Sequence, residues 1–234
     1  MANPKFLYPY TVRRSPRARH VRFVVSADGL VVVVPQRFAV SRDLLPLLES
    51  KREWIEKALH KIASRTLLRD AAKGVPGSIE FPSIGESWQV RSATLEKERF
   101  RAENGIVFLT SDYSETEAVI ALKRWVLQKG RIHLPPLLRK AAQYHAFQVA
   151  NVAVKEQKSL WGSCSSKSNI NLNCRLLFLS PELMRHVMLH ELCHLIEMNH
   201  SPAFYALLRK LDPETESNAR KLRRAWDLVP VWAL

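Results

Sequence analysis

The sequence feature that most constrains this chain is the motif His190-Glu191-Leu192-Cys193-His194. Ser180 followed by Pro181 is typical of a helix start, and apolar residues then recur at helical spacing. These apolar residues are Met184, Val187, Met188, Leu192, Leu195 and Ile196. Because four residues advance a helix by about 400°, His190 and His194 should project from one face, where two imidazoles can bind one cation.

Glu191 should point about 100° away from His190 around this helix. That direction is poor for a third ligand of the same ion, but it places the carboxylate beside a water molecule bound to the ion. Zinc lowers the pKa of its bound water from 15.7 to about 7, and a neighbouring carboxylate then acts as general base. The motif therefore predicts a metal-activated water with Glu191 as the catalytic residue.

The residues after the motif favour His200 as the third metal ligand. Asn199 is expected to take a left-handed conformation at the helix end, and Ser201-Pro202 is expected to start another helix. A sharp turn between the two helices would bring His200 back toward His190 and His194.

Glu197 and His186 are the alternatives for this third position. On an unbroken helix, residues seven after and four before His190 return to the same face. If Glu197 is not a ligand, it is a carboxylate that faces solvent or supports a ligand. If His186 is not a ligand, it lines the cleft beside the metal site. Three imidazoles suit zinc, so Zn2+ is the predicted metal.

Charge is the second strong signal, because the 234 residues carry a net charge of +14. Such an excess raises affinity for any polyanion through counterion release, so nucleic acid is one candidate partner and a solvated basic surface is the alternative. The basic residues match no recognition-helix or zinc-finger pattern. They are densest at Arg13, Arg14, Arg17, Arg19 and Arg22, and at Arg220, Lys221, Arg223 and Arg224.

Composition and cysteine usage indicate a cytoplasmic globular protein. A hydrophobic fraction of 47% supports a packed core, and no apolar run approaches the roughly 20 residues of a membrane span. The first residues lack the apolar core of a signal peptide. Three cysteines leave one unpaired under any disulfide scheme, so reduced thiols are expected, with Cys164 as an alternative, inhibitory metal ligand. The oligomeric state is left open.

Residues 1–110 are predicted to form a β-rich α+β accessory region. Alternating and β-branched residues indicate a hairpin over 20–34, and a period of 3.6 indicates a long helix over about 41–69. Short strands are predicted at 78–82, 87–93 and 105–110, separated by proline, glycine and asparagine.

Residues 111–234 are predicted to form a second domain that contains the motif. Ser114 and Glu117 make a capping box for a helix that Pro135-Pro136 should break or restart. Strands are predicted at 149–156 and 169–176, with a polar loop between them. After Ser201, Tyr205 is either a residue that stabilises an oxyanion or, preferably, part of the core beside its neighbour.

The motifs together resemble the YgjP-like metallopeptidase family, which is related to the SprT-like zinc proteases. The resemblance implies a compact zincin-like metallopeptidase domain with an α+β fold, in which His190, His194 and His200 bind zinc and Glu191 is the catalytic base. SprT-like relatives include proteases that act on protein crosslinked to DNA, which links the basic charge to nucleic acid by analogy. The matching segments are Trp161-Gly162-Ser163-Cys164, Asn169 to Leu176, His190 to His194, and Asn199-His200-Ser201-Pro202-Ala203-Phe204.

A zinc-dependent metallopeptidase acting on a peptide or protein substrate is therefore the leading functional hypothesis. One rival is a zinc hydrolase acting on small amides. The other is a nucleic-acid-binding protein with a structural zinc, whose four coordination positions would all be filled by protein ligands.

Overall fold

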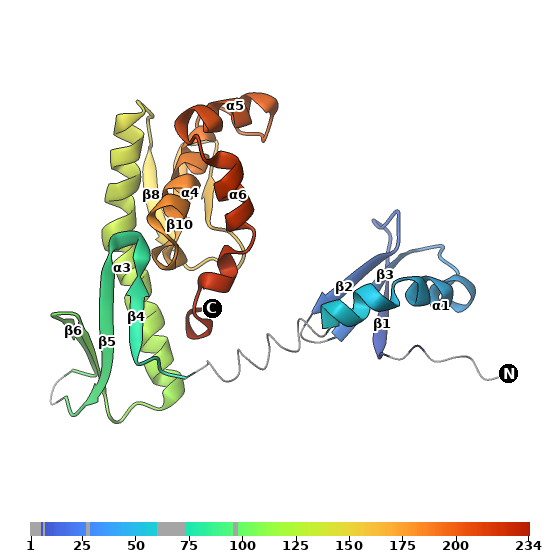
Figure 1. The fold of residues 1–234 in the computed structure, drawn as a ribbon, viewed down its shortest axis with the longest axis horizontal. Coiled ribbons are helices and arrows are strands. Elements are labelled where there is room, and N and C mark those ends of the chain that lie inside the picture. The colour runs from blue at the N-terminus through green and yellow to red at the C-terminus, as the bar shows by residue number, and fades with distance from the viewer. Residues whose placement is uncertain (1–5, 7, 27–28, 60–73, 96–97) are drawn as a thin grey trace. The chain divides into compact units, whose positions relative to one another are not determined.

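The structure, a computed structural model, describes residues 6, 8–26, 29–59, 74–95 and 98–234. The chain divides into two compact units, residues 1–72 and 73–234 (Figure 1). Both units combine helices with small sheets, so the predicted α+β class is confirmed. No helix within the described ranges is long and apolar enough to span a bilayer.

The first unit is a three-stranded sheet covered by a helix. The central strand β3 (Gly29–Pro35) pairs in parallel with β1 (Tyr10–Ser15) and antiparallel with β2 (Arg22–Ser26), which confirms the predicted hairpin. Helix α1 (Val40–Ser50) follows, residues 52–59 are helical again, and the rest of the predicted long helix lies outside the described residues. The core of this unit contains Phe6, Leu30, Val32, Val34, Leu44, Leu48 and Ile55.

The second unit begins with a four-stranded sheet in the order β4-β5-β7-β6. Its strands are β4 (Ser78–Phe81), β5 (Glu86–Ala93), β6 (Phe100–Glu103) and β7 (Ile106–Thr110), with the short 3-10 helix η1 (Pro82–Ile84) after β4. Three of these strands were predicted, and β6 was not. Ile79, Phe81 and Val107 are buried in one core with the residues of the following helix.

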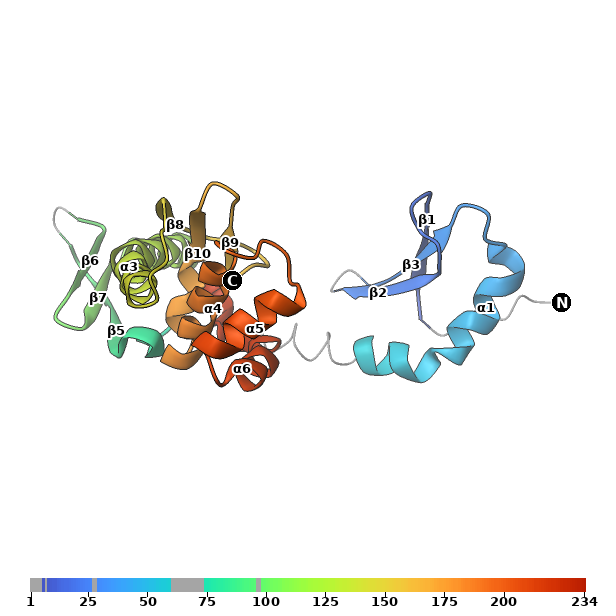
Figure 2. The same cartoon turned by 90° about the horizontal axis from the view of Figure 1, so that it is seen from above.

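This shared core places the start of the second unit earlier than the boundary predicted near residue 110. The apolar face of the β4–β7 sheet packs on helix α3 (Glu115–Tyr144), and Phe81 lies 5.5 Å from Trp125 between ring centroids. A sheet that buries its apolar face against a helix belongs to the same compact unit as that helix. Looking along α3, Figure 2 shows β5–β7 on one side of the helix and β8, β10 and α4 on the other.

Helix α3 runs without a break through Pro135 and Pro136, contrary to the prediction that they would end it. Its start is as predicted, since Ser114 and Glu117 form a complete capping box. A proline inside a helix removes one backbone hydrogen bond and destabilises it by roughly 3 kcal/mol. Leu134 and Leu138, both fully buried on either side of the prolines, compensate because they anchor this part of α3 in the core.

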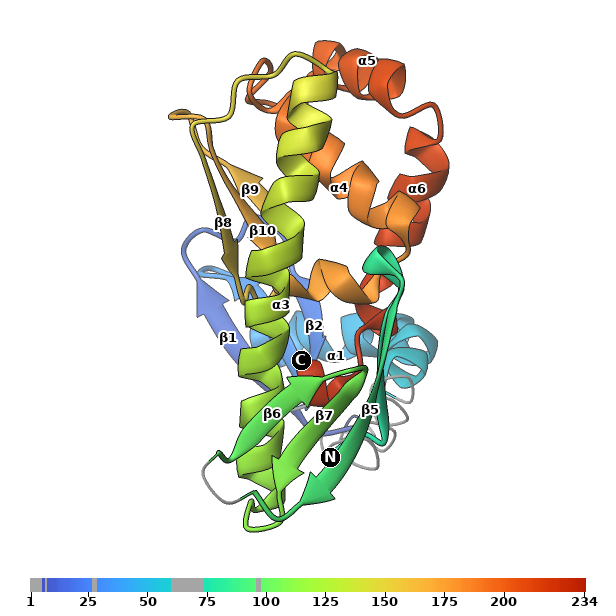
Figure 3. The same cartoon turned by 90° about the vertical axis from the view of Figure 1, so that its left-hand side faces the viewer.

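A second sheet and three helices complete the unit (Figure 3). Strand β10 (Asn169–Asn173) pairs in parallel with β8 (Asn151–Lys155) and antiparallel with the edge strand β9 (Gly162–Cys164). Residues 174–176, the end of the second predicted strand, instead belong to the 3-10 helix η2 (Cys174–Phe178). The remaining elements are α4 (Pro181–Cys193), α5 (Pro202–Leu211), α6 (Thr215–Leu222), η3 (Ala225–Leu228) and η4 (Val231–Ala233).

Candidate metal centre

Helix α4 positions the first two histidines as the sequence predicted. Ser180 caps the helix by accepting a hydrogen bond from the Leu183 backbone N–H, and Pro181 occupies the first turn. His190 lies in the last turn and His194 is the C-cap residue. Their ring centroids are 4.9 Å apart, so both imidazoles occupy one face at the end of α4.

His200 joins this pair after the chain turns. Its Nε2 lies 3.0 Å from Nε2 of His190, and its ring centroid lies 4.7 Å from that of His194. The ligand atoms of the three histidines all lie within 4.8 Å of one another. Zinc–nitrogen bonds of about 2.0–2.1 Å place tetrahedral ligands about 3.4 Å apart, so His190 and His200 already have nearly this spacing, and small side-chain shifts would bring all three onto one zinc ion.

The turn that brings His200 back does not use the predicted left-handed residue. Asn199 does not have a positive φ, whereas Asn104, Ala146 and Ser168 do. Instead the backbone N–H groups of Ile196 and Glu197 both bond to the Cys193 carbonyl, and the Ser201 N–H bonds to the Asn199 carbonyl. Ser201 then caps α5, as predicted, by accepting from the Phe204 N–H.

The two alternative third ligands are engaged elsewhere. His186 is buried, and its Nδ1 lies 2.6 Å from the Asp212 carboxylate. Glu197 accepts a hydrogen bond from the Ser201 hydroxyl through its side chain, and its backbone carbonyl accepts one from Nδ1 of His194. This last contact fixes the His194 tautomer and leaves Nε2 available to a metal. Among the described residues, neither His186 nor Glu197 belongs to a metal-capable cluster.

Burial keeps the histidines in the form that a metal requires. It lowers the pKa of His190 to about 3, with His194 and His200 as smaller causes. Burial also lowers the pKa of His200, and His194 adds to the effect. Metal coordination needs neutral imidazole, so both groups are ready to bind an ion at neutral pH.

Phe204 lies at this centre, a position that was not predicted from the sequence. It is fully buried, and its ring centroid lies 4.7–4.9 Å from the centroids of all three histidine rings. It therefore forms the apolar side of the cluster. Its neighbour Tyr205, predicted to pack in the core, is 42% exposed, with its ring 6.1 Å from that of His200.

Glu191 lies beside the histidines with its carboxylate almost completely buried. The side chain is 5% exposed, and Oε2 has no hydrogen-bond partner within the part of the chain that the structure describes. Burial raises the pKa of Glu191 to about 7. A buried oxygen without a partner is rare in proteins because it loses the hydrogen bonds of water, and among the described residues Oε1 of Gln157 is the other such side-chain atom.

The raised pKa of Glu191 predicts a pH-dependent stability of the metal-free protein. In the unfolded chain the group ionises near its ordinary value of 4.5, whereas in the folded chain it ionises near 7. Below pH 4.5 Glu191 is protonated in both the folded and the unfolded chain. Between pH 4.5 and 7 only the unfolded chain loses this proton, so the free energy of unfolding falls as the pH rises. Above pH 7 the free energy of unfolding has fallen by about 3 kcal/mol.

Glu191→Gln should remove this loss, so the variant should be the more stable protein at pH 8 and should gain little at pH 4. Urea unfolding across this pH range, with a chelator present, measures the difference. Glu182→Gln is the control on the same helix, because hydrogen bonding to Ser180 lowers the pKa of Glu182. Equal stability of the wild type and Glu191→Gln at pH 8 would contradict the burial argument.

Strand β9 approaches Glu191 closely at Gly162. A Cβ atom at this position would lie 2.7–2.8 Å from Cγ, Cδ and Oε1 of Glu191, which is closer than packed atoms come. Gly162→Ala should therefore lower the free energy of unfolding by about 1–3 kcal/mol. Gly77→Ala is the matched control, since nothing lies within 4 Å of its added Cβ, and a Gly162→Ala protein as stable as this control would show that β9 can move away.

Cys164 does not reach the metal cluster. Its thiol is half-buried, and desolvation raises its pKa, with the Glu191 charge as a smaller cause. A thiol with a raised pKa is a poor metal ligand, since the thiolate is the form that binds. The three cysteines Cys164, Cys174 and Cys193 are all free, as predicted.

Comparisons with known proteins found a family model and a solved structure that match this chain. A family model described as "YgjP-like, metallopeptidase domain" matches residues 19–225. Among solved structures, the crystal structure of the metallopeptidase zymogen of Pyrococcus abyssi abylysin matches with 25% sequence identity and a TM-score of 0.36, over 40% of this chain and 94% of that chain. No curated protein sequence matches.

Proposed function

The chain belongs to the YgjP-like metallopeptidase family, and from this membership we propose that it is a zinc-dependent peptidase. In this proposal His190, His194 and His200 hold the metal, and Glu191 is the general base. The observation that carries it is the buried Glu191 oxygen without a partner, on the helix whose two histidines form the cluster with His200.

The donor set supports zinc and an open coordination position. Three neutral imidazoles are a common ligand set for catalytic zinc, whose fourth position is left to water or substrate. When bound, such an ion lowers the pKa of water and polarises the carbonyl of the substrate. The part of the chain that the structure describes offers three clustered ligands and no fourth, which favours a catalytic over a structural zinc.

The protein groups perform the proton transfers of the proposed reaction. Glu191, with a pKa of about 7, takes a proton from the attacking water. The C–N bond of the peptide then breaks, and Glu191 returns the proton to the leaving amine. The Glu197 carbonyl holds the His194 ring through Nδ1, and Phe204 packs against all three imidazoles.

Metal content and product analysis test this proposal together. The purified protein should contain about one zinc per chain, and it should cut an unfolded protein into fragments in a reaction that a chelator stops. Small amides separate the peptidase from the rival amidase, because the rival would hydrolyse them and leave the unfolded protein intact. A zinc-loaded protein that cleaves neither substrate would contradict the enzyme hypothesis and favour a structural zinc.

A further inference from the structure

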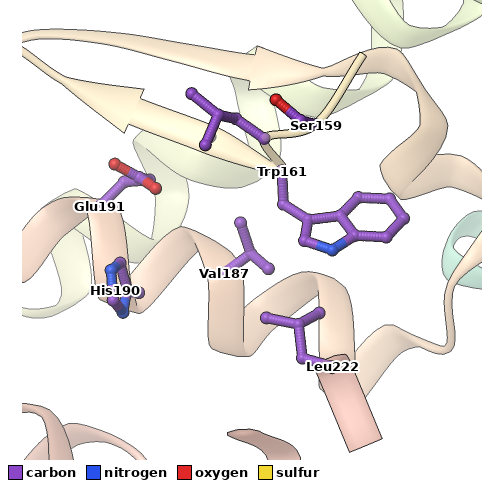
Figure 4. A pocket seen from close by; sticks show the side chains of 8 residues that line it. Ser159, Trp161, Val187, His190, Glu191 and Leu222 are labelled. Atoms are coloured by element: carbon purple, nitrogen blue, oxygen red, sulfur yellow. The ribbon is translucent and has the colours of Figure 1, made fainter. Parts of the chain in front are cut away.

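A cavity of about 200 Å³ lies beside the proposed catalytic residues. Figure 4 shows His190, Glu191 and Val187 along one stretch of α4, with Trp161 and Leu222 beyond them. The remaining walls are mostly apolar, from Leu160 and Trp161 before β9, Val187 of α4 and Leu222 of α6. The cavity therefore has a reactive end at Glu191 and His190 and an apolar end away from them.

The apolar end is built from side chains that are held in place. Trp161 is 9% exposed and stacks on Trp226, with ring centroids 4.2 Å apart and an angle of 22° between the planes. Val187 is 3% exposed and precedes Glu191 by one helical turn, so both side chains share this side of α4. The part of the wall that Trp161 and Val187 form is therefore in place before any substrate binds.

Buried polar groups fix the loop that carries Leu160 and Trp161. The side-chain amide of Asn173 donates to the carbonyls of Gln157 and Leu160, at 2.8 and 2.7 Å. The backbone N–H of Asn173 donates to the Trp161 carbonyl at 2.9 Å, and Arg175 donates to the Gln157 carbonyl. Since Asn173 and Arg175 are themselves buried, these bonds tie the loop to groups that the core holds in place.

The volume suits one side chain and not a whole small molecule. Pockets for whole ligands occupy about 300–1,000 Å³, whereas an apolar cavity of about 150 Å³ can bind benzene. A phenylalanine or leucine side chain therefore fits the space. An acidic side chain would lose its hydration there, and the lining residues include no lysine or arginine to pair with it.

We propose that this cavity binds a large apolar side chain of the substrate, from a residue next to the cleaved bond. The inference rests on the proposed function, because it assigns the reactive end of the cavity to peptide hydrolysis. Trp161 and Leu222 then determine specificity. Leu222 is contributed by α6, so one wall of the cavity comes from a helix that follows the motif helix in the sequence.

Binding without turnover is the first test. Saturation-transfer NMR on the full-length protein with a chelator present compares end-blocked Ala-Phe-Ala with Ala-Asp-Ala. The phenyl protons should receive saturation, and Ala-Asp-Ala should receive at least about ten times less, since burying a phenyl group is worth more than one factor of ten. Equal signals from the two peptides would overturn the proposal.

Substitutions at Leu222 locate the bound side chain. Leu222→Trp should fill the cavity and abolish the phenyl signal, whereas Leu228→Trp, at a residue that is 56% exposed and outside the cavity, should leave it unchanged. If Leu222→Trp does not fold, Leu222→Ala enlarges the cavity and should increase the signal of Ala-Trp-Ala. A phenyl signal that survives Leu222→Trp, or no gain with Leu222→Ala, would place the binding elsewhere and overturn the proposal.

The cleavage pattern separates this inference from the proposed function. Mass spectrometry of fragments from an unfolded protein should show Leu, Phe or Met enriched at least about ten-fold over Asp and Lys on one side of the cut bonds. Cleavage without such enrichment would refute the specificity and leave the peptidase intact. Phenyl binding without any cleavage would refute the peptidase and leave the apolar side-chain site intact.

Discussion

Glu191→Gln is expected to lower kcat/KM for peptide hydrolysis by about 10²–10⁴-fold while zinc stays bound. The amide keeps the size of the carboxylate and cannot accept the proton of the attacking water. Because Glu191 is not among the clustered ligand atoms, metal content should be unchanged. Peptide hydrolysis and zinc content, measured on the same preparation, test both parts.

Two measurements test whether the loss of activity in Glu191→Gln comes from unfolding of the variant. Glu191→Gln should be more stable than the wild type in the metal-free state at pH 8, as argued from the buried carboxylate. Loss of activity together with a gain in stability cannot come from unfolding, and it is the trade-off expected of a strained functional residue. Glu182→Gln on the same helix should retain activity. Undiminished turnover by Glu191→Gln would remove Glu191 as the base.

His200→Ala is expected to lower the affinity for zinc by more than about 100-fold. Substitution of a residue that only hydrogen-bonds to a metal ligand already lowers metal affinity by about 10–100-fold, and removal of a ligand should lower it further. His200 is exposed and lies outside α4, so its removal should disturb the core little. Competition with a chelating dye gives the affinity, and elemental analysis gives the zinc content.

Glu197→Gln and His20→Ala are the controls for this variant. Glu197 is the alternative third ligand and His20 is an exposed histidine of the first unit, so both substitutions should preserve zinc binding. Zinc retained by His200→Ala and lost by Glu197→Gln would identify Glu197 as the ligand. That outcome would overturn the assignment made from the histidine cluster.

Periodicity predicted the buried elements and missed several of the edge strands. The pattern before and within the motif identified α4 and its cap, and the alternation over residues 22–34 identified β2 and β3. Strands β1, β6 and β9 were not predicted, β9 because its residues were interpreted as a polar loop, and all three are edge strands. Most residues of β1 face solvent, so it carries no clear alternation of apolar and polar residues.

The motif likewise predicted only the part of the site that lies close in the sequence. His190 and His194 were predicted from their spacing, and the turn expected after the helix favoured His200 over Glu197 and His186. In the structure His200 clusters with the pair, and the two alternatives do not. Asp212 engages His186 at 2.6 Å from 26 positions away, and the backbone turn after Cys193 directs His200 to the pair.

The sequence by itself determined that His190 and His194 share one face of α4, because a helix fixes the relative direction of side chains one turn apart whatever surrounds it. Tertiary structure alone decided how deeply Glu191 is buried and what shape of cavity lies beside it. These properties depend on contacts between α4, β9 and α6, which are distant in the chain. Burial and desolvation arise only when such segments pack together, so local sequence patterns do not contain them.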